Sequence, residues 1–252
     1  MTKSLKSASG DLGSAIQFLT LVPLPFVSYR PDALSRAVKF FPFVGALIGS
    51  AAALLNMALI RHLPRLISAF VVVTFLTLIT GCLHEDGLAD AADGFGGGHT
   101  REKILLILRD SCIGSYGAAS LCLSIVGRII LISALPAGRM TGYLIVANVL
   151  CRWTILPLSY FLTSAREGEG QGARVARLTG TSSLIFGTLF AYTLAGVVLR
   201  WQAMLPAVVS LLITYLSGRF YFKKIGGMTG DCFGATTQLA EIAVYLCGVW
   251  AA

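Results

Sequence analysis

Charged residues are scarce in this sequence, and acidic residues are fewer than basic ones. The 20 Lys and Arg and the 12 Asp and Glu residues make up 13% of the 252 residues, against about 25% in a typical soluble domain. Hydrophobic residues reach 56%, and the mean hydropathy is +0.78. This composition excludes a disordered, collagen-like or disulfide-framework chain and disfavours a soluble globule. It predicts an all-α, polytopic integral membrane protein.

Three further signals are missing. None of the six cysteines belongs to a C-x-x-C pair, so neither a zinc site nor a thiol–disulfide site is predicted. A cleavable signal peptide is not predicted, because Pro23 and Pro25 interrupt the first apolar stretch and no A-x-A site closes it. The net charge of +8 does not indicate a nucleic-acid partner, because the bases lie between apolar runs rather than on one soluble face.

Long apolar runs dominate what is present. Seven are long enough, or nearly so, to cross about 30 Å of hydrocarbon, which takes about 20 helical residues. We expect about seven transmembrane helices (range six to eight) in one domain, residues 1–252. The stretch 14–27 is shorter, and we predict it to be an interfacial or re-entrant helix. The seven runs are 40–60, 66–83, 113–135, 141–163, 182–199, 202–218 and 234–251.

The basic residues predict the orientation. Fourteen fall on the side of the N-terminus and of the connections 84–112, 164–181 and 219–233. Only four fall on the other side. An excess of Lys and Arg marks cytoplasmic segments, so we expect the N-terminus and these connections in the cytoplasm. The four on the other side are Arg61, Arg65, Arg139 and Arg200.

Half of the acidic residues lie between 85 and 110, in and after the string GCLHEDGLADAADGFGGG. At 100° per residue, Asp86, Asp90 and Asp93 share a helical arc about 60° wide, whereas Glu85 and His84 fall outside it. Like charges at these spacings repel. A divalent cation removes the conflict, and Mg²⁺ favours carboxylate oxygen shared with substrate phosphate. The arc therefore predicts a Mg²⁺ site on a helix that continues the second span.

Residues suited to an anion follow the acids. We expect the glycine run 94–98 to be a loop with accessible N–H groups, and Arg101, Lys103 and Arg109 add positive charge. Asp110 and Ser111 come next. Two other connections carry glycine-rich strings, AREGEGQG at 165–172 with Arg166 and GGMTGDCFGA at 226–235 with Asp231. Acids for a metal beside bases for phosphate are typical of phosphoryl transfer.

Polar residues also fall inside the last span. Glu241 and Gln238 lie there, where an ionisable group is costly and usually paired or functional. Arg128 and Arg152 lie within other spans. We expect one of these two arginines to pair with Glu241.

Together the strings HEDGLADAADGF at 84–95, RDSCIGSYG at 109–117, AREGEGQG and GGMTGDCFGA resemble the cobalamin synthase family. QFLTLVPLP at 17–25 and FFPFVGALIG at 40–49 extend the likeness to the N-terminal region. The resemblance implies an adenosylcobinamide-GDP ribazoletransferase of the bacterial inner membrane. A hydroxyl of α-ribazole, or of α-ribazole 5′-phosphate, attacks the cobinamide-linked phosphorus, and GMP leaves. The resemblance also implies that Mg²⁺ is the cofactor and that the active site faces the cytoplasm. Whether the chain forms a homo-oligomer is left undecided.

Matched position by position, the family motif falls on a short set of polar residues, with two departures. Cys112 stands where the family commonly has Arg, and the loop after Arg166 is longer. The resemblance and the charge pattern assign Asp86, Asp90 and Asp93 to the metal. Asp231 or Asp110 is expected to complete the metal site or to take the proton from the attacking hydroxyl, and His84 is the other candidate base. The residues expected to bind the substrate diphosphate are Arg101, Lys103, Arg109, Ser111 and Arg166.

Two other classes share parts of this pattern. A CDP-alcohol-type membrane phosphotransferase has D-x2-D-G-x2-A-R followed by G-x3-D-x3-D. Residues 90–94 match its start, but the Ala-Arg and the second aspartate pair are missing. An ion or metal transporter would place its acids near the bilayer midplane, whereas here they fall at a span end.

Overall fold

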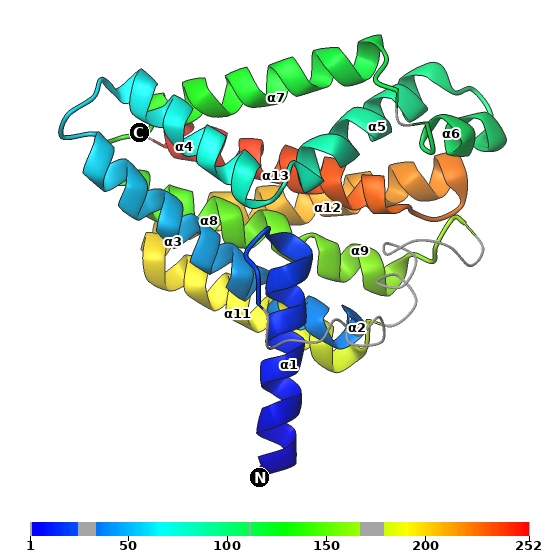
Figure 1. Ribbon diagram of the computed structural model, residues 1–252, viewed down its shortest axis with the longest axis horizontal. Helices are drawn as coiled ribbons and strands as arrows, with labels where there is room; N and C mark the ends of the chain where they lie inside the picture. The colour runs from blue at the N-terminus through cyan, green and yellow to red at the C-terminus, as the bar shows by residue number, and fades with distance from the viewer. Residues whose placement is uncertain (1, 25–33, 111, 167–178, 252) are drawn as a thin grey trace.

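The computed structural model describes residues 2–24, 34–110, 112–166 and 179–251, and this part of the chain is helical (Figure 1). Its one β feature is an isolated parallel bridge between Ser164 and Met228. The helices are α1 Thr2–Leu19, α2 Leu34–Ala37, η2 Val38–Phe40, α3 Phe41–Leu59, α4 Arg65–Ile79, α5 Leu83–Gly97, α6 Arg101–Ile107, α7 Ser115–Ala134, α8 Met140–Trp153, α9 Ile155–Phe161, α11 Thr181–Leu199, η3 Arg200–Ala203, α12 Met204–Ile225 and α13 Gly230–Trp250.

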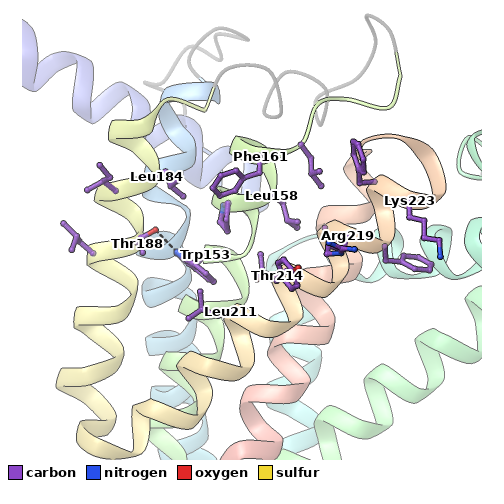
Figure 2. Close-up of a pocket in the computed structure, with 17 residues that line it drawn as sticks. Trp153, Leu158, Phe161, Leu184, Thr188, Leu211, Thr214, Arg219 and Lys223 are labelled. Atoms are coloured by element: carbon purple, nitrogen blue, oxygen red, sulfur yellow. Dashed lines mark hydrogen bonds between the residues drawn. The ribbon is translucent and has the colours of Figure 1, made fainter.

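Five helical segments of the described residues are long and apolar enough to cross a membrane, or six if α4 and α5 form one bent span. One of the five, Thr181–Ile225, has 45 residues and folds back on itself. Arg200 interrupts it with a φ of 54°, and the hydroxyl groups of Tyr192 and Ser210 then lie 3.3 Å apart. The segment therefore contributes two helices that meet at the turn around Arg200 and diverge away from it (Figure 2).

Burial separates inner from outer helices. In the apolar 18-residue stretch of each segment, the share of buried residues is 78% for Met140–Phe161 and 72% for α13. It is only 22% for α7 and 28% for Thr181–Ile225. The outer helices expose large apolar side chains, which suit contact with lipid rather than with water. These side chains include Leu123, Val126, Ile130, Leu189, Val197, Val208 and Leu212.

Three sequence predictions about local structure are wrong. The helix expected over 14–27 begins at Thr2 and ends at Leu19. The second span does not continue straight into the acidic segment, because α4 and α5 meet at 86°, with Gly81 and Cys82 at positive φ. The glycine run is not a loop: residues 94–97 close α5, and Gly98 caps it. The connection 84–112 is therefore largely the two helices α5 and α6.

The described parts of three connections that carry the sequence motifs meet at one end of the bundle (Figure 1). We call these connections, 84–112, 164–181 and 219–233, the motif regions. Arg101 on α6 donates from Nε to the Ile225 carbonyl and from Nη2 to the Ala165 carbonyl, both at 2.9 Å. The Ala165 N–H donates to the Met228 carbonyl at 2.9 Å. One arginine and one short bridge thus join segments from α6, from the end of α9 and from the α12–α13 turn.

Candidate active site

The outer face of α5 carries two of the predicted carboxylates. Asp86 and Asp90 are four residues apart and so lie one helical turn from each other. Asp86 is exposed and Asp90 is half-buried. Both carboxylates are therefore at least partly accessible from the protein surface, Asp86 more than Asp90.

Asp231 reaches this face because α5 and α13 cross with almost no side chain between them. An added Cβ at Gly87 would lie 3.0 Å from the Gly234 Cα and 3.2 Å from the Asp231 Cα. Asp231 stands in the first turn of α13, and its Oδ2 accepts a hydrogen bond from the Thr229 hydroxyl at 3.0 Å. Asp86, Asp90 and Asp231 are close enough for their charges to interact. We call these three residues the acidic face.

Arg166 supplies a cation to the acidic face. Its Nη2 lies 3.8 Å from Asp231 Oδ2, and both side chains are about one-fifth exposed. The backbone just before it is held by the Met228 N–H, which donates to the Thr163 carbonyl at 3.0 Å. The arginine is thus presented at the acids by paired backbone rather than by a free loop.

A basic hollow adjoins Arg166. Its volume is about 370 Å³, and Arg101, Arg109 and Arg166 line it together with Glu102, Leu105, Leu106 and Ala165. Arg101 donates two hydrogen bonds to backbone carbonyls, so it holds together the segments that form the hollow. Arg109 and Arg166 add two further positive charges to its lining.

The acidic face fits Mg²⁺ by its donor chemistry. Within the described ranges, no three His, Cys, Asp or Glu side chains are close enough to hold a metal ion alone. Mg²⁺ is commonly held by one or two carboxylates, with substrate phosphate and water completing its shell. Asp86, Asp90 and Asp231 offer carboxylate oxygens of that kind beside a basic hollow.

Asp93 has a different environment. It is 8% exposed, and its Oδ2 accepts the Gly114 N–H at 2.7 Å while its Oδ1 accepts the Gly117 N–H at 2.9 Å. Both oxygens therefore serve the beginning of α7, where a negative charge is favoured by the helix dipole. The predicted third metal ligand is, in this structure, a helix cap.

The family model described as cobalamin-5-phosphate synthase matches residues 11–249. The chain belongs to this family. The match covers α5, α6 and α13 and so includes every residue of the acidic face.

Curated relatives of this family are similar over nearly their whole length. A protein of Ralstonia nicotianae is 36% identical over 97% of this chain and 96% of its own. One of Azorhizobium caulinodans is 41% identical over 95% and 94%, and one of a Sinorhizobium species is 40% identical over 93% and 94%. Each bears the name adenosylcobinamide-GDP ribazoletransferase. No solved structure matches.

Among the remaining predicted residues of this family member, those that the structure describes lie apart from the acidic face. Lys103 is exposed on α6 and does not line the hollow. Asp110 is exposed, and its Oδ1 accepts the Cys112 N–H at 3.0 Å. Ser111 lies outside the described residues. His84 is 4% exposed and lies near the buried Arg128 and Arg152, so its imidazole points inward, away from a substrate.

A buried ion cluster supports α5 from behind. Arg128 Nη2 donates to Glu85 Oε1 at 2.8 Å, and its Nη1 lies 3.6 Å from Glu241 Oε2. All three side chains are 5% exposed or less. The predicted pairing of Glu241 with Arg128 is confirmed, whereas Arg152 donates to Asn148 at 2.8 Å instead. Glu85 was not predicted as a member of this cluster, although its position off the acidic arc was a signal that it faces the interior.

Proposed function

We propose that the acidic face and the basic hollow are the site at which this family member transfers a phosphoryl group. The chain is an adenosylcobinamide-GDP ribazoletransferase, a transferase of cobalamin biosynthesis. In the reaction, a hydroxyl oxygen of α-ribazole, or of its 5′-phosphate, bonds to the cobinamide-linked phosphorus. The bond from that phosphorus to GMP breaks, and the hydroxyl proton is lost. The products are adenosylcobalamin, or its 5′-phosphate, and GMP.

In this proposal the arginines bind the diphosphate, and the aspartates bind the metal or accept the proton. Arg166 and Arg109 bind the diphosphate in the hollow and orient the phosphorus toward the acids. Asp231, which Arg166 holds at 3.8 Å, is the candidate base for the hydroxyl proton. Asp86 and Asp90 would hold Mg²⁺, which neutralises charge on the leaving phosphate when it is bound. Asp93 keeps α7 against α5 and so positions Asp90.

The site belongs to the cytoplasmic face in this proposal. Its support is the charge pattern, with fourteen basic residues on the side of the motif regions and four on the other. We also propose seven membrane crossings in a bacterial inner membrane. The count follows when the bent pair α4–α5 forms one crossing and α11 and α12 form one each.

One observation carries the proposal: Asp231 of α13 and Arg166 of another connection meet the α5 carboxylates. The purified chain in vesicles, given Mg²⁺, α-ribazole and adenosylcobinamide-GDP, is expected to release GMP and form the cobalamin product in equal amounts. Omission of α-ribazole or Mg²⁺ is expected to stop both. Transfer from a CDP-linked alcohol, or ion flux without GMP release, would instead support one of the two other classes.

A further inference from the structure

A second cavity of the described residues lies away from the acidic face. It has a volume of about 1340 Å³ and opens between α11 and α12, where these two helices diverge, with α8–α9 behind it (Figure 2). Leu158, Phe161, Leu184, Leu189 and Leu211 make its walls apolar. Trp153 Nε1 donates to Thr188 Oγ1 at 2.9 Å across its floor. We call this cavity the lateral groove.

The lateral groove has a charged end and an apolar body. Arg219 and Lys223 line it and are one turn apart on α12, near the end of that helix at the motif regions. No Asp or Glu lines the groove, and neither cation forms an ion pair with a described residue. Arg219 lies 5.9 Å from the Tyr215 ring. Like charges four residues apart repel on a helix, so the pair favours an anion.

The surroundings indicate where such an anion comes from. The groove lies between helices with exposed apolar side chains, including Ile185, Leu189, Leu211 and Tyr215. Its apolar body runs along the spans and its cations stand at their end. A bilayer phospholipid has the same polarity, with acyl chains along the helices and a phosphate at the membrane face. Basic pockets between membrane helices are typical sites for anionic lipid head groups.

We propose that the lateral groove binds an anionic phospholipid of the surrounding bilayer, with its phosphate at Arg219 and Lys223. A second copy of the chain fits the groove less well. In a two-fold contact both copies offer the same patch, so the partner's copy of this patch supplies no carboxylate. The inference does not depend on the proposed reaction, because neither cation belongs to the acidic face or the basic hollow.

The test uses the full chain in detergent, with native mass spectrometry of retained lipid. Phosphatidylglycerol and phosphatidylcholine with identical acyl chains are the probes. We expect stronger retention of phosphatidylglycerol. The double variant Arg219→Gln and Lys223→Gln should lose about fivefold of that preference for each charge removed. Lys224→Gln is the control, compared per charge removed: it takes one positive charge from the same helix end, but Lys224 does not line the groove.

A second variant separates the groove from general surface charge. Leu211→Trp adds bulk within the groove and should lower retention of both lipids while GMP release stays at the parent level. Equal retention of both lipids by the parent chain would overturn the proposal. So would an equal loss in Lys224→Gln, a groove protected only in a dimer, or displacement of the lipid by adenosylcobinamide-GDP.

Discussion

At the scale of single residues, Asp93 shows that a carboxylate of the motif can serve the fold. Both of its oxygens accept N–H groups at the beginning of α7. Replacing Asp93 with Asn removes the charge and leaves one acceptor oxygen. We expect Asp93→Asn to lower the free energy of unfolding by about 1–2 kcal/mol, measured by denaturation in detergent. Glu102→Gln, at an exposed acid, is the control and should change it by less than about 0.5 kcal/mol. Unchanged stability with activity lost would make Asp93 a metal ligand instead.

The buried cluster around Arg128 offers a second residue-scale prediction. Arg128→Met would leave Glu85 and Glu241 as uncompensated buried charges, and breaking such a pair costs about 3–5 kcal/mol. Adding Glu85→Gln and Glu241→Gln to the same variant removes those charges. We therefore expect the triple variant to recover part of the lost free energy of unfolding. A triple variant less stable than Arg128→Met alone would argue against a compensated cluster.

At the scale of elements, the crossing of α5 and α13 decides whether Asp231 reaches the acids of α5. Gly87→Ala would place a Cβ about 3.0–3.2 Å from the backbone of α13, so the two helices must separate. We expect a loss of about 1–3 kcal/mol in stability and a lower kcat. Gly97→Ala is the matched control, because its Cβ would meet only the Ile107 Cδ1, at 3.6 Å. It should leave activity unchanged. Equal effects of the two variants would show that the close crossing is not needed.

Much of the element pattern could be predicted from apolar runs. The runs 40–60 and 113–135 correspond to α3, Phe41–Leu59, and α7, Ser115–Ala134. The bend after α4 could not be predicted, because the positive φ of Cys82 is a conformation that a residue other than glycine seldom adopts. The glycine run is helical for a similar reason, since Gly94 and Gly96 pack against Leu108 and Tyr116. Tertiary contacts there override the preference of glycine for loops.

Part of the site could be predicted from the sequence, and part could not. Helical spacing alone places Asp86 and Asp90 on one face, and the order of motifs adds Asp231 and Arg166. The cap formed by Asp93 has no sequence signal, because its donors are backbone N–H groups that lie 21 and 24 residues further along. The bracing role of Arg101 is hidden too, since its acceptors are carbonyl groups of distant segments.

At the scale of the whole molecule, the two ends of the bundle differ in charge. Arg65 donates to the Leu135 carbonyl at 2.9 Å and Arg139 bonds to the Ala251 carbonyl, so these bases gather at the end opposite the motif regions. We expect a topology reporter fused near residue 100 to be read in the cytoplasm. The control is a reporter in the 60–64 connection, which should be read in the periplasm. The reverse result would overturn the orientation.

The central claim is that the acidic face carries the chemistry, and Asp90 tests it most directly. The measurement is GMP released from adenosylcobinamide-GDP by purified Asp90→Asn in vesicles, beside Asp110→Asn as the matched control, because Asp110 is exposed and lies apart from the acidic face. We predict that Asp90→Asn loses about 10²–10³-fold in kcat, while its unfolding curve and its membrane insertion match those of the parent. Asp110→Asn should keep the parent rate. Undiminished GMP release by a folded Asp90→Asn variant would contradict the account.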